Sequence, residues 1–137
     1  MPTRAQERLE KAYTDVSQVL TDWGPAKDRD GNVADVDSNR YGGLCHKVPV
    51  LIRTCGLCQA VAFMESKKAK EKSHKRMLQH IASILGVDAG ELATAVAQMP
   101  TVEYMHKTRL LLEALLYYKR FAVSILKTEA DSGGEQE

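Results

Sequence analysis

The sequence predicts an all-α protein, built as a single-domain bundle of about five to six helices with long second and last helices. Apolar residues recur at steps of three and four through most of the chain, which is the pattern of a helix with one buried face. No segment shows the strict alternation of a half-buried strand. A length of 137 residues favours one domain. We therefore expect one helical domain over residues 1–127 and an acidic, disordered tail over residues 128–137.

The first helix is predicted to begin after Thr3 and to end at Trp23. Thr3 and Gln6 have the spacing of a capping box, in which two groups at a helix start satisfy each other. Gly24-Pro25 ends the helix, and the polar, acidic residues 26–38 are predicted to form a loop. The apolar stripe of this helix comprises Ala5, Leu9, Ala12, Val16, Val19, Leu20 and Trp23.

The second helix is predicted to begin at Ser38 or Asn39 and to end near Ser66. Pro49 lacks a backbone donor and crowds the preceding turn, so we expect a kink or a break there. Three small residues would let another helix approach closely: Gly56, Ala60 and Ala62. The broad apolar face comprises Leu44, Val48, Leu51, Ile52, Cys55, Cys58, Ala62 and Phe63.

Two shorter helices are predicted next, over residues 73–85 and 88–98. Gly86 is suited to end the first of them, because glycine readily adopts the left-handed conformation found after a helix. Asp88 and Glu91 have the spacing of a second capping box, which would open the second.

The last helix is predicted to run from Thr101, which can cap its start, to about Lys127. Pro100 separates it from the preceding helix, and Glu103 suits the positive end of the helix dipole. At 1.5 Å per residue this helix would be about 40 Å long. The residues that can face a core are Val102, Met105, Leu112, Leu115, Leu116 and Ile125.

The net charge of +1 hides an uneven distribution of charge along the chain. Residues 39–86 carry nine basic and two acidic side chains, whereas residues 1–38 carry five basic and eight acidic ones. Residues 101–127 are basic again, and the segment that follows them carries four acids and no base. A basic middle between acidic ends creates a local field that attracts an RNA backbone, an acidic neighbour or another copy of the chain.

Three cysteines and one histidine raise the question of a metal or redox site. Cys55 and Cys58 form a CxxC, and Cys45-His46 lies ten residues earlier. These four side chains match the number of zinc ligands, but the CxxC falls inside an apolar helical run instead of on a turn. A redox CxxC opens a helix beside a βαβ pattern, which the sequence lacks. We therefore expect small buried hydrophobes and no metal or cofactor, with a Cys/His metal-binding or redox protein as a less favoured alternative.

Neither catalytic motifs nor membrane segments are found in the sequence. It contains no HExxH, no glycine-rich phosphate loop and no GxSxG. His74 and His80 lie six residues apart, about 240° around a helix, which does not suit an acid–base pair. The longest nearly uncharged run, residues 48–63, is too short to span a bilayer. We expect a cytoplasmic protein that is not an enzyme and does not contact a membrane.

Several short blocks follow one another in a characteristic order. They are Ala12-Tyr13, Lys47-Val48-Pro49-Val50-Leu51 with Arg53, the block 56–63, Tyr104, Thr108-Arg109 and Lys119-Arg120-Phe121-Ala122. In order and spacing these blocks resemble the small all-helical subunit of Cmr-type (type III-B) CRISPR effector complexes, over nearly the whole chain. Two features depart from that family: Tyr117 or Tyr118 stands where a tryptophan is common, and the loop at 26–38 is longer than usual.

The resemblance implies a non-catalytic subunit of a ribonucleoprotein that acts in antiviral defence. In that family, copies stack head to tail beside the backbone subunits that hold the guide RNA, and flank the groove where target RNA pairs with it. The implied partners are other subunits of the effector complex, copies of this chain, and guide and target RNA. A generic helical protein-interaction adaptor is the alternative, since the periodicity and charge alone also fit one.

Five cations within the matching blocks are predicted to face RNA phosphates. A guanidinium can bond phosphate through two N–H groups, and an ammonium adds a point charge. Such contacts position a strand without reading its bases. The predicted residues are Lys47, Arg53, Arg109, Lys119 and Arg120.

Overall fold

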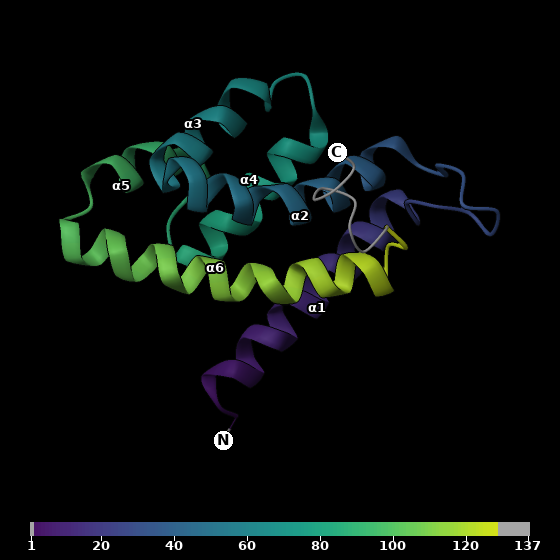
Figure 1. The fold of residues 1–137 in the computed structure, drawn as a ribbon, viewed down its shortest axis with the longest axis horizontal. Coiled ribbons are helices and arrows are strands. Elements are labelled where there is room, and N and C mark those ends of the chain that lie inside the picture. Colours follow the sequence, from purple (N-terminus) through teal and green to yellow (C-terminus); the bar gives the residue numbers. More distant parts are fainter. Residues whose placement is uncertain (1, 129–137) are drawn as a thin grey trace.

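The structure, a computed structural model, describes residues 2–128. Within them the chain is an all-α bundle without a named strand, as predicted (Figure 1). Its elements in this part are α1 (Arg4–Trp23), α2 (Val36–Cys55), α3 (Leu57–Lys67), α4 (Lys72–Leu85), the 3-10 turn η1 (Ala89–Glu91), α5 (Leu92–Gln98) and α6 (Thr101–Ser124). The domain boundary expected at residue 127 stays a prediction, and residues 129–137 of the expected tail lie outside the described residues.

Helix α1 begins as the sequence predicts. The Thr3 hydroxyl accepts a hydrogen bond from the Gln6 N–H at 3.1 Å, and the Gln6 side-chain carbonyl accepts one from the Thr3 N–H at 2.7 Å. This capping box satisfies donors that the first turn of a helix leaves free. At the other end, Gly24 adopts a φ of 90° and ends the helix. The predicted stripe is buried in its central part, whereas Leu9 remains 43% exposed.

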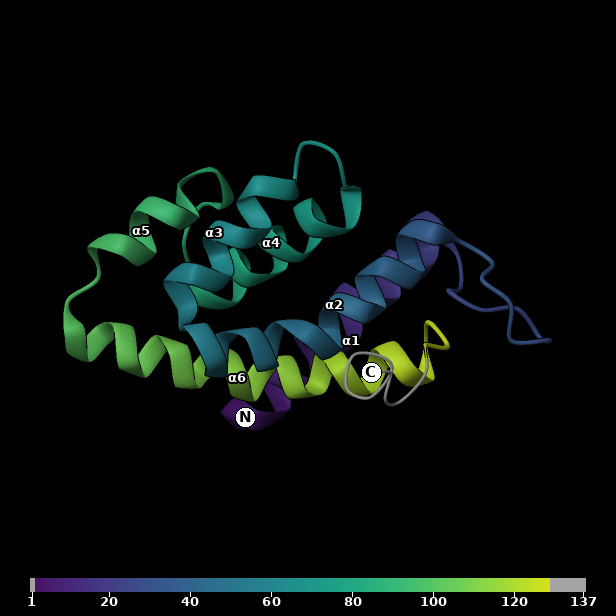
Figure 2. The same ribbon diagram turned by 45° about the horizontal axis from the view of Figure 1, so that its top comes forward.

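The second helix, predicted as one element to about residue 66, is in fact two helices that meet at Gly56. Pro49 does not end the helix, because α2 continues past it. The helix ends at Gly56 instead, where the φ of 90° is a conformation that residues with a Cβ rarely adopt. The Cys58 N–H, at the start of α3, donates to the Tyr104 hydroxyl at 3.0 Å. A side chain of α6 therefore accepts a hydrogen bond from a backbone N–H in the first turn of α3. From Gly56 onward, α3 runs in a different direction from α2 (Figure 2).

The shorter helices lie close to their predicted positions. Helix α4 covers residues 72–85, and Gly86 ends it in the left-handed conformation, as expected. The predicted short helix is present as η1 followed by α5, and the Asp88 carboxylate accepts a hydrogen bond from the Gly90 N–H at 3.0 Å. The expected cap at Thr101 is wrong: Pro100 occupies the cap position, and no side chain caps α6.

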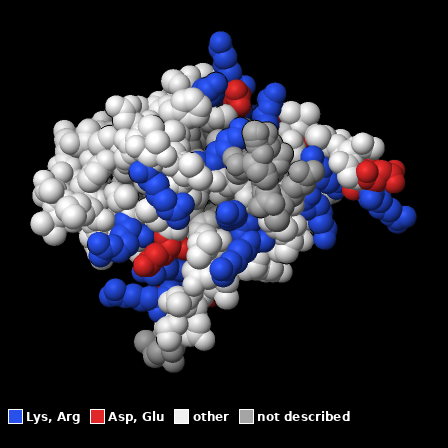
Figure 3. Space-filling view, viewed as in Figure 1, with Lys and Arg blue, Asp and Glu red and all other residues white. Residues whose placement is uncertain are grey.

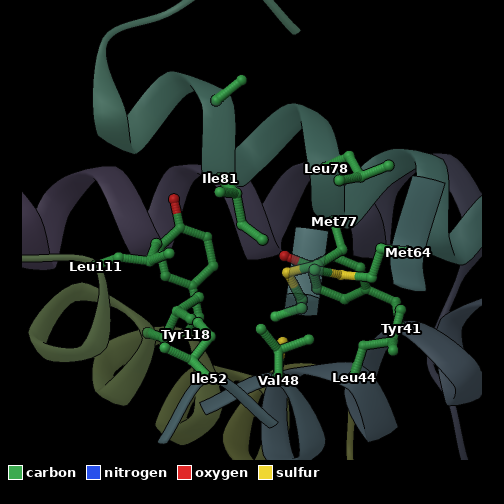
Figure 4. Packing of buried hydrophobic residues seen from close by; sticks show 14 of the residues in the cluster. Tyr41, Leu44, Val48, Ile52, Met64, Met77, Leu78, Ile81, Leu111 and Tyr118 are labelled. Carbon is green, nitrogen blue, oxygen red and sulfur yellow. The ribbon is translucent and has the colours of Figure 1, made fainter. Parts of the chain in front are cut away.

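The core lies where α2, α4 and α6 meet. Helix α6 packs against α1 and α2, and α2 packs also against α4 (Figure 1). Tyr104 lies beside Gly56, and Thr128 lies beside Gly42, so α2 and α6 run antiparallel. Side chains of all three helices fill this space, and Met64 of α3 joins them (Figure 4). Large buried side chains from the three helices include Tyr41, Met77, Ile81, Leu111, Leu115 and Tyr118.

Helix α6 buries only part of the face predicted for it: Leu115 is fully buried, and Leu112 and Ile125 are partly buried against the core. Val102, Met105 and Leu116 were expected in the core, but their side chains are 79%, 58% and 44% exposed. Both sides of this helix carry apolar residues, so helical spacing alone fits either face. The face that packs on α1 and α2 comprises Leu111, Ala114, Leu115, Tyr118 and Ala122.

Polar side chains tie α1 to the rest of the bundle across long stretches of sequence. The Tyr118 hydroxyl of α6 donates a hydrogen bond to the Asp15 carboxylate of α1. Nearer the start of both helices, Arg8 forms an ion pair with Glu113 at 3.0 Å. These contacts hold the first and last helices of the described chain against each other.

A buried tyrosine–histidine pair connects α2 with α4. The Tyr41 hydroxyl lies 2.5 Å from His80 Nδ1, and both side chains are buried. Burial lowers the pKa of His80 to about 4, against an opposing effect of the Asp15 carboxylate. His80 is therefore a neutral hydrogen-bonding group of the core at pH 7.

Two adjacent glycines of α2 should respond oppositely to the same substitution. A Cβ on Gly42 would overlap the buried Thr128 side chain, whereas a Cβ on Gly43 would meet nothing within 4 Å. Overpacking costs about 1–3 kcal/mol, and alanine gains about 0.5–1 kcal/mol over glycine inside a helix. We expect Gly42→Ala to lower the free energy of unfolding by about 1 kcal/mol or more, and Gly43→Ala to raise it by about 0.5 kcal/mol.

Urea denaturation of both variants beside the unchanged protein measures this difference. Because the two positions are neighbours in one helix, Gly43→Ala is the matched control for helix propensity. An equal gain in both variants would show that the segment ending in Thr128 does not pack on α2.

Candidate nucleic-acid interface

The five predicted cations lie on two helices and point outward. Lys47 and Arg53 belong to α2, and Arg109, Lys119 and Arg120 belong to α6. Four are exposed and Lys119 is partly exposed. Within residues 2–128, none of them forms an ion pair. Their charges are thus available to a ligand or a partner.

The structure does not gather these five cations into one cluster. Arg109 and Arg120 are eleven residues apart on α6, which places them about 20° apart around the helix and about 16 Å apart along it. Lys119 lies about 80° from Arg109 around the same helix. On α2, Lys47 and Arg53 are about 120° apart around the axis and face different sides. The arginines of α6 therefore share a face, while Lys47 belongs to another surface.

The outward face of α6 combines cations with apolar side chains. Val102, Met105 and Leu116, the three residues that were wrongly expected in the core, lie on the same side as Arg109 and Arg120. Figure 3 shows basic side chains spread over the face that carries α2 and α6, with acidic side chains at few points. A face of this composition suits a partner surface that is partly apolar and partly acidic.

A second basic surface, which sequence reasoning missed, is a groove between α2, α3 and α4. The groove has a volume of about 430 Å³. Its cations are Lys27 from the loop after α1, Arg40 and Lys47 from α2, and Lys67 from the end of α3. We call it the cationic groove. Arg40 and Lys47 are seven residues apart and hence on one side of α2, which is the signal that could have paired them.

A buried histidine forms the inner wall of the cationic groove. His74 Nδ1 lies 3.1 Å from the Glu71 carboxylate. Burial lowers the pKa of His74, and the positive charges of Lys67, Arg40 and Lys47 lower it further, although Glu71 opposes them. Lys67, Arg40 and Lys47 thus all lie close enough to the His74 ring to disfavour its protonated form.

The cysteines do not converge on one another. Cys45 is buried, and burial raises the pKa of its thiol to about 12. The thiol is therefore uncharged at pH 7, and Cys45 acts as a small apolar residue of the core. Cys55 and Cys58 are exposed on either side of Gly56, so the expectation that they are buried is wrong. They extend beyond the core because α2 ends between them. In the part of the chain that the structure describes, no three His, Cys, Asp or Glu side chains group as metal ligands would.

None of the helices within residues 2–128 combines the length and apolar composition needed to cross a bilayer. The fold and the surface together define a small helical protein in which cations on one helix face and in one groove have no ion-pair partner among residues 2–128.

The chain belongs to the CRISPR-associated Cmr5 family. The family profile described as CRISPR-associated protein (Cas_Cmr5) matches residues 4–125. A curated relative, the CRISPR system Cmr subunit Cmr5 of Thermus thermophilus, is 33% identical over 128 residues, which cover 93% of this chain and 99% of the relative. The crystal structure of a CRISPR-associated Cmr5 family protein from the same organism aligns with a TM-score of 0.71 at 33% identity, covering 92% of this chain and 99% of that one. The resemblance read from the sequence is confirmed.

Proposed function

We propose that this chain is a non-catalytic small subunit of a type III-B CRISPR ribonucleoprotein in the cytoplasm. In this proposal, copies stack beside the backbone that holds the guide RNA, and they stabilise target RNA during antiviral defence. Family membership carries the proposal. The exposed cations that no acidic side chain within the described residues neutralises support it.

The geometry of α6 suits contact with a nucleic-acid backbone. A rigid helix holds Arg109 and Arg120 on one face, about 16 Å apart along its axis. Guanidinium groups at fixed positions can bond phosphates without reading bases, so sequence recognition is left to pairing between guide and target. The function of this face is then to hold a strand in place.

The same helix supports the stacking part of the proposal. Val102 and Met105 are more than half exposed near the start of α6, and Leu116 is 44% exposed further along. Apolar side chains at an outward face gain free energy when a second protein covers them. Head-to-tail stacking joins two different faces of the same chain, and such contacts extend into a filament when they do not close.

Affinity purification from the native host, with RNA retained and sequenced, tests the proposal. We expect repeat-derived guide RNAs together with a set of partner subunits, identified by mass spectrometry. Recovery of the protein without RNA and without such partners would refute it.

Replacing both arginines on the α6 face should weaken target-RNA binding by the assembled complex. For Arg109→Ala with Arg120→Ala, we expect the slope of log affinity against log salt to fall by about two, because each phosphate contact contributes about one. Arg4→Ala with Arg29→Ala removes two exposed arginines elsewhere and is the matched control. An unchanged slope in the first variant would show that Arg109 and Arg120 do not contact RNA phosphates.

A generic helical adaptor is the second candidate, favoured by the exposed apolar residues of α6. Such an adaptor would bind a protein partner with an affinity that salt barely changes, because apolar burial is insensitive to screening. The less favoured metal or redox function depends on the thiols. Unchanged assembly after replacement of Cys45, Cys55 and Cys58 by serine would exclude a metal or redox function.

A further inference from the structure

The cationic groove is positive on several sides. Lys27, Arg40, Lys47 and Lys67 line it from three different segments of the chain. Glu71 is the acidic side chain among the described residues that line it, and its carboxylate is already paired with His74. Four cations facing one carboxylate leave a positive potential that favours an anion.

The start of α4 adds to this potential. The helix begins at Lys72, next to Glu71, whose side chain does not cap it. The first turn of a helix carries free N–H groups and the positive end of the helix dipole. His74, in that first turn, faces the groove. The His74 N–H itself already donates to the Glu71 carbonyl at 3.2 Å, so this helix start contributes through the field of its dipole and not through a direct bond from that group.

An exposed aromatic ring lies at the edge of the same groove. Phe63 of α3 is 44% exposed and lines both the cationic groove and an adjoining apolar hollow on α2. Lys67 Nζ lies 5.3 Å from the centre of its ring, and the centre of the His74 ring lies 6.1 Å from it. These neighbours hold the ring in place beside the cations.

We propose that the cationic groove holds an unpaired stretch of RNA, with phosphates bound by Lys27, Arg40, Lys47 and Lys67 and a base stacked on Phe63. A positive groove with an aromatic platform is how proteins bind single strands without sequence preference, since every base has a π-face. An acidic peptide would satisfy the cations but would leave the ring without a stacking partner. In a duplex the faces of the bases are already stacked, so an unpaired segment fits better. The inference rests on the proposed function, which brings RNA to this protein.

A photo-crosslinking residue at the groove edge tests this inference in the assembled complex. Phe63→p-benzoylphenylalanine places the reactive group at the proposed platform. Leu9→p-benzoylphenylalanine is the matched control, because Leu9 is 43% exposed and lies on α1. We expect RNA to crosslink at position 63, at nucleotides that are unpaired in the complex, and not at position 9.

Three results would overturn the inference: crosslinks from position 63 to protein alone, crosslinks to paired nucleotides alone, or no more RNA crosslinking than at position 9. Copurified guide RNA and partner subunits are scored on the same sample. If guide RNA and partner subunits are present but position 63 does not crosslink to RNA, the assignment of RNA to the cationic groove is wrong and the proposed function stands. If the unchanged protein recovers neither RNA nor partners, the function and the inference that rests on it both fail.

Affinity measurements on the complex give a second readout. Arg40→Glu with Lys47→Glu should lower the salt slope of RNA binding by at least about two. Lys70→Glu with Lys75→Glu, which changes charge equally outside the lining of the groove, should lower it less. Phe63→Ala should weaken binding at least about fivefold, and Phe63→Tyr should restore it, because stacking needs the ring. Equal effects of the two charge pairs, or full binding by Phe63→Ala, would contradict the assignment.

Discussion

Truncating Leu115 should cost the protein about 2–5 kcal/mol of its free energy of unfolding, the range for removing a buried leucine side chain. Leu115 is fully buried on the face of α6 that packs against the core. The loss combines the transfer of apolar surface with the cavity that remains. Since a whole domain is stable by only about 5–15 kcal/mol, Leu115→Ala should be marginally folded at physiological temperature.

The neighbouring leucine provides the control. Leu116→Ala makes the same chemical change one position along the same helix, but Leu116 is 44% exposed. We expect its free energy of unfolding to change by less than about 1 kcal/mol, measured by urea denaturation. The same variant should weaken assembly if α6 is a stacking face. Comparable destabilisation in both variants would mean that the outward face of α6 is assigned wrongly.

Acid should destabilise the protein through His80. Its pKa is about 4 in the folded state and near 6.5 when unfolded, so between these values the unfolded chain binds more protons. Stability should therefore be full above pH 6.5 and fall as the pH drops towards 4. A shift of this size corresponds to about 3 kcal/mol.

The variant His80→Gln isolates this effect. Glutamine can keep a hydrogen bond with Tyr41 but does not titrate. His74 has a lowered pKa too and contributes in the same direction, so the informative quantity is the difference in slope between the two proteins. Free energies of unfolding measured from pH 7 to pH 4 should fall less steeply in the variant. Parallel curves would show that His80 is not the group responsible.

Element positions were largely predictable, because local signals set them. The capping box at Thr3, the stop at Gly86 and the proline before α6 act within one helical turn, and the structure agrees with each of these. Gly56 was misread as a small packing residue. What distinguishes it is a positive φ beside the Tyr104 hydroxyl, a partner far away in the chain that a single sequence does not reveal.

The binding surfaces were less predictable, for two physical reasons. Helix α6 has apolar residues on two sides, and only its packing against α1 and α2 decides which side is buried. The cationic groove is assembled from a loop and three helices, so Lys27 and Lys67 had no local signal that linked them to Lys47. Charge and family blocks identified Lys47 itself, although not its neighbours.

The pairing of α1 with α6 also has a consequence for how the chain folds as it is made. Asp15 cannot bond Tyr118 until 103 further residues have been added, and Arg8 cannot meet Glu113 until 105 residues have followed it. The part of the first helix that packs on α6 therefore stays uncovered until most of the chain has been synthesised. Contacts between such distant residues also slow folding, since a long loop must close before they form. A helical protein of this size should accordingly fold after translation, and more slowly than bundles whose helices pack in sequence order.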